Sequence, residues 1–327
     1  MLLELLIGLL AIWAGMFFFG LLTCGIQYLL WKNKGFLFMN FTCLFWRWDK
    51  DFYDPDEPGR IRCSFTRLNQ FFPTLLMMSK TYPMEKSRRN ARISAVIYFI
   101  LSLLLLGGGG VIALFAPDTP WLLFVRYALG GGFAYFLTMA LYSHKSGSKP
   151  AGLVQKICEI REVMIRNDAD DLPQIPFAYP EYARATLTDK VNYLGIFYRY
   201  AEVRNDLMAM AEAANAYSKL GTMTLTETGH FRVDTALFAY YSFRERKPEL
   251  AKKYYEHSKK SIDRDMDSNG RRKLAYYAFY ILGDRELAGT YLEQGLRALD
   301  VDDPRLSDIE RDLETRMLRY LESQLAK

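Results

Sequence analysis

The sequence predicts an all-α protein with a membrane-spanning front part and a charged rear part built from paired helices. Three apolar stretches, residues 5–31, 93–116 and 121–142, each exceed the ~18–20 residues that a helix needs to cross a bilayer. From residue 152 onward, apolar residues recur with a helical period, and helix breakers follow at helix-length intervals. The composition shift near His144 therefore separates a membrane part from a helical part.

Composition divides the chain into three parts. Residues 1–145 are predicted to form a transmembrane domain, in which residues 32–92 make a long loop between the first two helices. Residues 146–180 form a linker that contains one helix and, in its second half, three prolines at positions 173, 176 and 180, and residues 181–327 form a helical domain. The first apolar stretch is predicted to be a retained anchor, because no basic residue precedes it and no small-residue cleavage site ends it.

Loop charges predict the orientation of the helices. The 32–92 loop is rich in Lys and Arg, and basic residues also follow the third apolar stretch, whereas the 117–120 turn has none. The positive-inside rule places the loop and the C-terminal domain in the cytoplasm and the N-terminus outside. We therefore expect a multi-pass protein of the cell (cytoplasmic) membrane.

Two features lie within the predicted membrane spans. Gly107–Gly110 and Gly130–Gly132 stand at similar distances from the outer turn, so we expect them to face each other and to permit close helix packing. Arg126 lies on the same side of the membrane as Glu4, and an ionisable residue within a span is a functional candidate. We expect Arg126 to extend to the membrane surface or to pair with Glu4.

The 32–92 loop contains two apolar segments that are too short to span a bilayer. Gly35–Trp48 is aromatic and β-prone, and Gln70–Met78 is broken by a proline. Such runs are typical of strands, interfacial segments or re-entrant hairpins. The basic run that follows is expected to contact anionic lipid headgroups, where each cation adds about 1 kcal/mol of attraction. Its predicted membrane-surface residues are Lys86, Arg88, Arg89 and Arg92.

A short phrase recurs in the C-terminal domain. Residues 247–251 read Lys-Pro-Glu-Leu-Ala, and residues 284–288 read Asp-Arg-Glu-Leu-Ala, with Glu249 and Glu286 37 positions apart. Aromatic residues follow both copies, and residues 205–207 form a weaker, earlier copy. A recurrence of this length indicates a repeat of helical hairpins that must stack to bury their apolar faces.

Leu274–Pro304 resembles a tetratricopeptide repeat (TPR), with Gly283-Asp284 at the turn between its two helices. Thr235–Asn269 is similar but looser, and Val191–Leu220 matches poorly, so the TPR-like region covers about residues 181–304. Pro304–Gln324 carries one apolar stripe on an otherwise charged helix, as expected of a helix that caps a repeat array.

The TPR resemblance implies a protein-interaction surface lined by the first helix of each hairpin. The exposed candidates for binding a partner are Asn192, Arg199, Arg244, Lys273 and Tyr277. This interpretation describes a non-enzymatic membrane protein that recruits or scaffolds a protein partner through its cytoplasmic helices.

The order of parts also resembles bacterial site-2-type (M50) membrane metalloproteases. In that family a first-helix HExxH motif supplies two zinc ligands and a general base. Residues 22–26 occupy the corresponding position here and read Leu-Thr-Cys-Gly-Ile, without His or Glu. The alternative hypothesis is therefore a degenerate or atypical protease, or pseudoprotease, and an accessory subunit of a transporter is a further alternative.

Other chemistry has little support in the sequence. The four cysteines form no CxxC pair, the three histidines are far apart, and no nucleophile arrangement is recognisable. The net charge of +5 is modest, and no basic helix interleaved with aromatic residues suggests nucleic-acid binding. We therefore predict no catalytic residue, no cofactor and no metal ligand.

Overall fold

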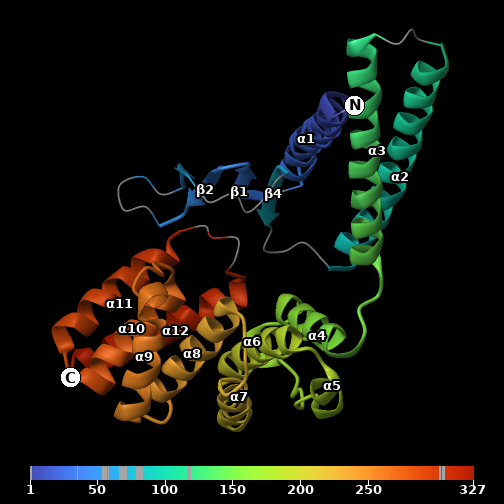
Figure 1. Ribbon diagram of the computed structural model, residues 1–327. Coiled ribbons are helices and arrows are strands. Elements are labelled where there is room, and N and C mark those ends of the chain that lie inside the picture. Colours follow the sequence, from blue (N-terminus) through green and yellow to red (C-terminus); the bar gives the residue numbers. More distant parts are fainter. Residues whose placement is uncertain are drawn as a thin grey trace. The chain divides into compact units, whose positions relative to one another are not determined.

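The computed structural model describes residues 2–34, 36–53, 57, 59–65, 72–78, 84–115, 119–301, 303 and 306–327, without the side chains of residues 2–4, 84–86 and 227. The protein is mostly helical and contains one small antiparallel sheet (Figure 1). It divides into two compact units. The first comprises Met1–Asp51 and Gly59–Ser148, and the second comprises Phe52–Pro58 and Lys149–Lys327.

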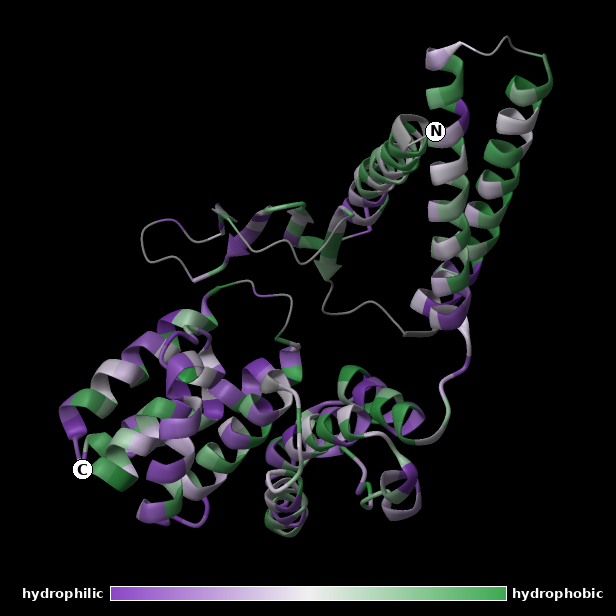
Figure 2. Ribbon diagram, in the orientation of Figure 1, coloured by the Kyte–Doolittle hydropathy of each residue, from purple (hydrophilic) through white to green (hydrophobic). Residues whose placement is uncertain are grey.

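Three long helices dominate the first unit: α1 (Leu2–Lys32), α2 (Met84–Phe115) and α3 (Pro120–Gly147). All three are long and apolar enough to cross a membrane, and hydrophobic residues run along almost their whole length (Figure 2). The predicted three apolar helices are thus confirmed. The second helix begins nine residues earlier than expected, because the basic run before residue 93 continues the same helix.

Glycines bring α1 and α3 into backbone contact. A Cβ built on Gly131 would lie 2.0 Å from the carbonyl oxygen of Ile12, and one on Gly15 would lie 1.9 Å from that of Ala128. Gly109 lies near Leu129 and Gly132 near Leu105, but the other glycines of the α2 run and Gly130 have open space around them, so the expected contact between Gly107–Gly110 and Gly130–Gly132 is wrong. Small residues do allow close helix packing here, but the partner of α3 at Gly131 is α1 rather than α2.

The two apolar segments of the 32–92 loop contribute to a four-stranded sheet with the order β3-β2-β1-β4. Its strands are β1 (Leu37–Cys43), β2 (Trp46–Asp51), β3 (Arg60–Phe65) and β4 (Thr74–Met78), and all neighbours are antiparallel. Side chains alternate between the two faces of a strand. The register therefore places Trp46 and Trp48 on one face with Phe65, while Arg47 and Asp49 form an ion pair on the other.

The second unit consists of helices that pack mainly as antiparallel neighbours. Its helices are α4 (Gly152–Arg166), η1 (Ala169–Asp171), α5 (Tyr179–Arg184), α6 (Leu187–Val203), α7 (Leu207–Leu220), α8 (Glu227–Phe243), α9 (Pro248–Ile262), α10 (Ser268–Tyr277), η2 (Ala278–Leu282), α11 (Arg285–Leu299) and α12 (Asp308–Leu325). The pairs α6–α7, α8–α9 and α10–α11 form helical hairpins, and α4, expected in a linker, packs on α6.

The three hairpin turns share one backbone conformation. Asn205, Arg246 and Gly283 have φ angles of 55°, 51° and 69°, and each directly precedes the N-cap residue of the second helix. The N–H of that N-cap residue donates back to a carbonyl near the end of the first helix, as in a Schellman motif. The recurring sequence phrase therefore marks the start of each second helix.

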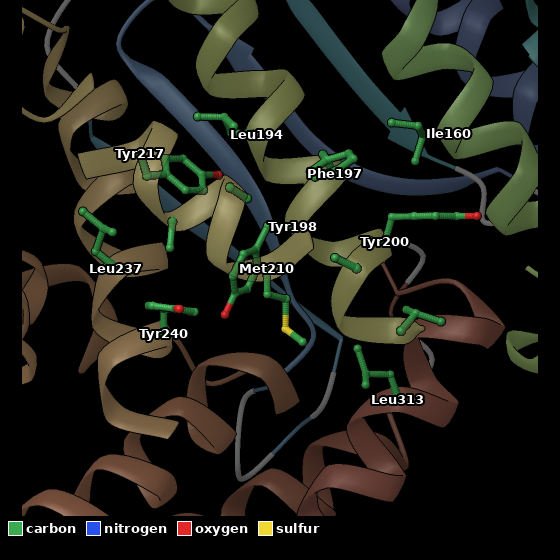
Figure 3. Packing of buried hydrophobic residues seen from close by; sticks show 14 of the residues in the cluster. Ile160, Leu194, Phe197, Tyr198, Tyr200, Met210, Tyr217, Leu237, Tyr240 and Leu313 are labelled. Carbon is green, nitrogen blue, oxygen red and sulfur yellow. The ribbon is translucent and has the colours of Figure 1, made fainter. Parts of the chain in front are cut away.

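A tyrosine-rich core holds the hairpins together (Figure 3). Tyr198, Tyr217 and Tyr240 come from three different helices and belong to the same buried cluster as Leu194 and Leu237. Burying a large aromatic side chain contributes about 1.5–3 kcal/mol, but its hydroxyl must find a partner. Two buried tyrosines elsewhere in the unit meet this need through the backbone: Tyr276 donates to the carbonyl of Met317 at 2.8 Å, and Tyr193 accepts from the N–H of Ala178.

A candidate partner groove on the helical unit

A groove of about 500 Å³ runs along the first helices of the three hairpins, α6, α8 and α10. Its apolar lining includes Val191, Ile196 and Tyr198 of α6 and Ala236 and Ala239 of α8. The lining also includes polar and charged side chains of both signs. Protein-binding surfaces usually combine apolar with polar side chains in this way.

Three of the five predicted partner-binding residues line this groove: Asn192 and Arg199 on α6 and Lys273 on α10. Arg244 lines a different cavity at the end of α8. Tyr277 is only 6% exposed, stacks on Tyr255 and makes an edge-to-face contact with Phe238, so its expected exposure is wrong. The helical period placed Tyr277 on the first helix correctly but could not show which neighbours cover that face.

Asn192 is joined to α8 across the groove. Its side-chain oxygen accepts a hydrogen bond of 2.5 Å from the exposed Arg232 guanidinium. Arg232 is not among the residues that the sequence predicts for partner binding, because the TPR-like match in this part of the chain begins at Thr235. The N-cap at Thr226 places the start of α8 well before that point, and a helix counted from Thr226 would have included Arg232.

Arg199 lines the groove, but its guanidinium is engaged in a largely buried ion-pair network rather than free at the surface. Its guanidinium lies 3.0 Å from Glu202, 2.7 Å from Glu314 and 3.3 Å from Glu310. Arg272, which is 2% exposed, lies 2.9 Å from Glu202 and 2.6 Å from Glu314. The network joins α6, α10 and α12, which are far apart in sequence.

The network controls the ionisation of its own carboxyl groups. Burial opposes the charged form of Glu202, but Arg272 and Arg199 outweigh it and lower the pKa of Glu202 to about 2. The pKa of Glu314 is likewise lowered, because the same two guanidinium groups outweigh its burial. Both carboxylates are therefore charged at neutral pH, and each is satisfied by a buried cation.

Lys273 and Asp265 both line the groove and influence each other electrostatically. Burial and the neighbouring Arg272 lower the pKa of Lys273, whereas Asp265 partly restores it. Burial and the nearby Asp267 raise the pKa of Asp265 to about 6. In both groups the surroundings disfavour the charged form. A charged partner in the groove would therefore change the ionisation of Lys273 and Asp265 most.

The predicted membrane-surface residues lie at the start of α2. Arg92 Nε donates 2.8 Å to the carbonyl of Gly147, at the end of α3, whereas the side chain of Arg89 is exposed. Arg88 Nε is buried and has no hydrogen-bond partner among the described residues. The side chain of Lys86 lies outside the described part of the chain. Lipid contact by these residues stays a prediction.

Arg126 lies in α3 and donates 3.0 Å to the backbone carbonyl of Ile112 in α2. The side chain of Glu4 lies outside the described part of the chain, so the expected pair with Arg126 stays a prediction. The observed hydrogen bond provides the guanidinium with a polar partner within the helix pair.

Residues 22–26, where the protease family carries its zinc motif, lie against the start of β4. The Cys24 thiol lies 3.7 Å from the carbonyl of Pro73, and the Pro73 ring lies against Gly20. Among the described residues, no group of three His, Cys, Asp or Glu side chains is placed to hold a metal ion.

Comparison with family models, with curated proteins and with solved structures returned no match to this chain. The residues and their geometry are therefore the basis for the proposed function. The groove on α6, α8 and α10 brings together three of the five residues predicted to bind a partner.

Proposed function

We propose that this chain is a multi-pass membrane protein that recruits a protein partner through the groove on its TPR-like helical unit. The observation that carries the proposal is the groove itself, which the first helices of three consecutive hairpins line with apolar and charged side chains. A scaffold needs a rigid binding surface, and the buried ion pairs beneath the groove fix the positions of α6 and α10.

The membrane part of the proposal is supported by three helices of sufficient length and apolarity. The excess of basic residues in segment 32–92 supports a cytoplasmic helical unit with an outside N-terminus. The expected result is that the chain stays with membranes after an alkaline wash and needs detergent for extraction. A tag after Lys327 should be degraded by added protease only in broken cells, and degradation in intact cells would overturn the orientation.

The partner should be a protein segment with both apolar and charged side chains. Arg232 and Asn192 lie at the accessible rim, where a reversed charge changes binding with little effect on the core. The Asn192→Glu/Arg232→Glu double variant is therefore expected to lose the partner. Lys252→Glu, on the exposed side of α9, changes charge outside the groove and is the matched control.

The experiment compares proteins that co-purify with the full-length chain and with these variants, using quantitative mass spectrometry. The proposal requires a protein that is retained by the wild type and by Lys252→Glu but lost from the groove variant. If all three chains retain the same set of proteins in equal amounts, the groove does not recruit them. Circular dichroism of each variant checks that the helices remain folded.

The second candidate function is a pseudoprotease that binds a substrate beside α1. It is favoured by the contact between Pro73 and residues Gly20 and Cys24, which brings a strand against the segment where the protease motif would lie. Metal analysis tests an active form of this alternative. If the purified protein contains stoichiometric zinc, and removal of the zinc abolishes a cleavage activity, the protein is a protease and the scaffold proposal is wrong.

A further inference from the structure

A second cavity, of about 610 Å³, lies where α8 ends and α12 passes close by. Arg244 and Arg246 enter it from the turn after α8, and Arg316 enters it from α12. Tyr240, Phe243 and Tyr320 form its aromatic wall. This volume lies within the range of small-molecule sites, which combine an apolar wall with a few convergent polar groups.

The cavity has an excess of positive charge. Within the described part of the chain, none of the three arginines forms an ion pair with a carboxylate. Two carboxylates also line the cavity, but both have other partners. Glu202 pairs with Arg199 and Arg272, and Glu245 pairs with Lys247. Arg316 donates one hydrogen bond to the carbonyl of Val203, and Arg246 donates one to that of Phe243. A guanidinium has five N–H groups, so an anion that enters the cavity would find the remaining donors of these arginines.

Arg244 is partly removed from water. Burial lowers its pKa, and its guanidinium carbon lies 4.3 Å from the centre of the Phe243 ring. Its Nε is buried and has no hydrogen-bond acceptor among the described residues. A buried donor without an acceptor is unfavourable, and a bound anion would satisfy it.

Arg246 occupies a backbone position that disfavours its own side chain. Its φ of 51° lies in the left-handed region, where the equivalent turns of the other two hairpins have Asn205 and Gly283. Asparagine and glycine are the residues that tolerate this conformation best. The Arg246 guanidinium lies over the Tyr280 ring, 3.8 Å from its centre, and also lines the cavity. An arginine held at this position at a cost in strain indicates a role for its side chain beyond folding.

We propose that this cavity binds a soluble organic phosphate. The phosphate group is held by Arg244, Arg246 and Arg316, because guanidinium groups bind phosphate oxygens through paired, charge-assisted hydrogen bonds. The organic part lies against Tyr240 and Tyr320. Glu202 lines both this cavity and the groove on α6, α8 and α10, but the three arginines line only the cavity, and Asn192 and Arg232 line only the groove. Failure of the phosphate proposal would therefore leave the scaffold proposal intact, and the converse also holds.

Isothermal titration of the full-length chain in neutral detergent with phenyl phosphate and with inorganic phosphate, at constant ionic strength, tests the proposal. Both probes should bind saturably, and phenyl phosphate should bind more tightly because its ring reaches the aromatic wall. Arg246→Gly and Arg316→Gln should each weaken binding about tenfold. Arg319→Gln, on the exposed side of α12, should bind like the wild type.

The Arg246→Gly variant separates binding from folding. Glycine accepts a φ of 51° without strain, which offsets the lost contact between Arg246 and the Tyr280 ring. The thermal midpoint should therefore stay close to that of the wild type while phosphate binding falls. Absence of saturable binding to either probe would overturn the proposal, as would equal weakening by Arg319→Gln. A lipid source is distinguished by vesicles of phosphatidylcholine with and without phosphatidic acid. Binding seen only with phosphatidic acid in the bilayer would also overturn the assignment of a soluble ligand.

Discussion

Replacing Arg272 by methionine removes a cation that two buried carboxylates share. In the wild type, Arg272 lies 2.9 Å from Glu202 and 2.6 Å from Glu314, and all three side chains are at most 6% exposed. In the Arg272→Met variant, Arg199 alone must neutralise both carboxylates, together with Glu310. We expect the helical unit to lose a large part of its stability.

The magnitude follows from the ionisation of the network. Lowering the pKa of Glu202 from 4.5 to about 2 corresponds to roughly 3 kcal/mol of favourable interaction, at 1.36 kcal/mol for each pKa unit. Removing one partner of a buried ion pair costs about 3–5 kcal/mol in proteins. Both arguments predict that Arg272→Met lowers the free energy of unfolding by about 3 kcal/mol or more.

Hydrogen–deuterium exchange of the full-length chain measures this loss locally, because peptides of α6, α10 and α12 can be followed separately. Their protection should fall together in Arg272→Met. The control is Arg319→Met, whose ion pair with Glu322 is exposed and should contribute nothing measurable. Unchanged protection of α6, α10 and α12 in Arg272→Met would refute the reasoning.

A double variant tests the electrostatic origin of the effect. Arg272→Met/Glu314→Met removes one cation and one carboxylate, and leaves Glu202 with Arg199. Because replacing both members of a buried pair by apolar residues is often neutral, the double variant should be more stable than Arg272→Met alone. Additive destabilisation would show that packing, rather than charge, explains the result.

Two further predictions concern a helix contact and a pH effect. Gly131→Leu should destabilise the first unit by about 2 kcal/mol, because the new side chain meets the backbone of Ile12, whereas Gly110→Leu, with open space around it, should not. Tryptophan fluorescence during thermal unfolding in detergent checks this, since all five tryptophans lie in the first unit. Asp265→Asn should stabilise the second unit near neutral pH. Since folding raises the pKa of Asp265 from 3.8 to about 6, the gain over the wild type should grow from pH 4 to pH 6 and vanish below pH 4, as measured by hydrogen–deuterium exchange.

The same relation between pKa and folding stability predicts the pH range in which the ion-pair network ceases to stabilise the helical unit. Folding lowers the pKa of Glu202 and of Glu314 below the usual 4.5. Their contribution to stability is therefore complete above pH 4.5, and it is lost as the pH falls toward about 2, the folded-state pKa of Glu202. Acid unfolding of the helical unit should shift to higher pH in Arg272→Met, which removes the largest cause of that lowering.

Local signals explain why much of the fold could be predicted from the sequence. The three apolar helices depend on length and composition, and the hairpin turns depend on adjacent residues such as Gly283 and Asp284. The two apolar runs of segment 32–92 were compatible with strands, but pairing of β2 with β3 depends on long-range register, which a single run does not contain. The sheet was therefore predicted only as short β-like segments.

The sequence predicts the candidate site only in part, because residue spacing shows which side chains share one face of a helix but not what covers that face. The period of α6 placed Asn192 and Arg199 on one face, and both line the groove. Nothing local indicates that Arg199 meets Glu310, 111 residues later, or that Tyr277 is covered by Phe238. Burial of these side chains depends on how the hairpins stack, and stacking is a property of the tertiary structure.

The position of Glu314 and Glu310 in α12 has a consequence for how the helical unit is completed during synthesis. Arg199 and Arg272 leave the ribosome before either of these carboxylates exists, so the earlier hairpins initially carry two guanidinium groups with Glu202 as their only acid in the network. In a simple repeat array, each hairpin could pack on the preceding one as soon as it is synthesised. In this chain the ion-pair network is complete only after α12 has packed on α6 and α10. A chain that ends before α12 would therefore expose unbalanced charge to chaperones and proteases.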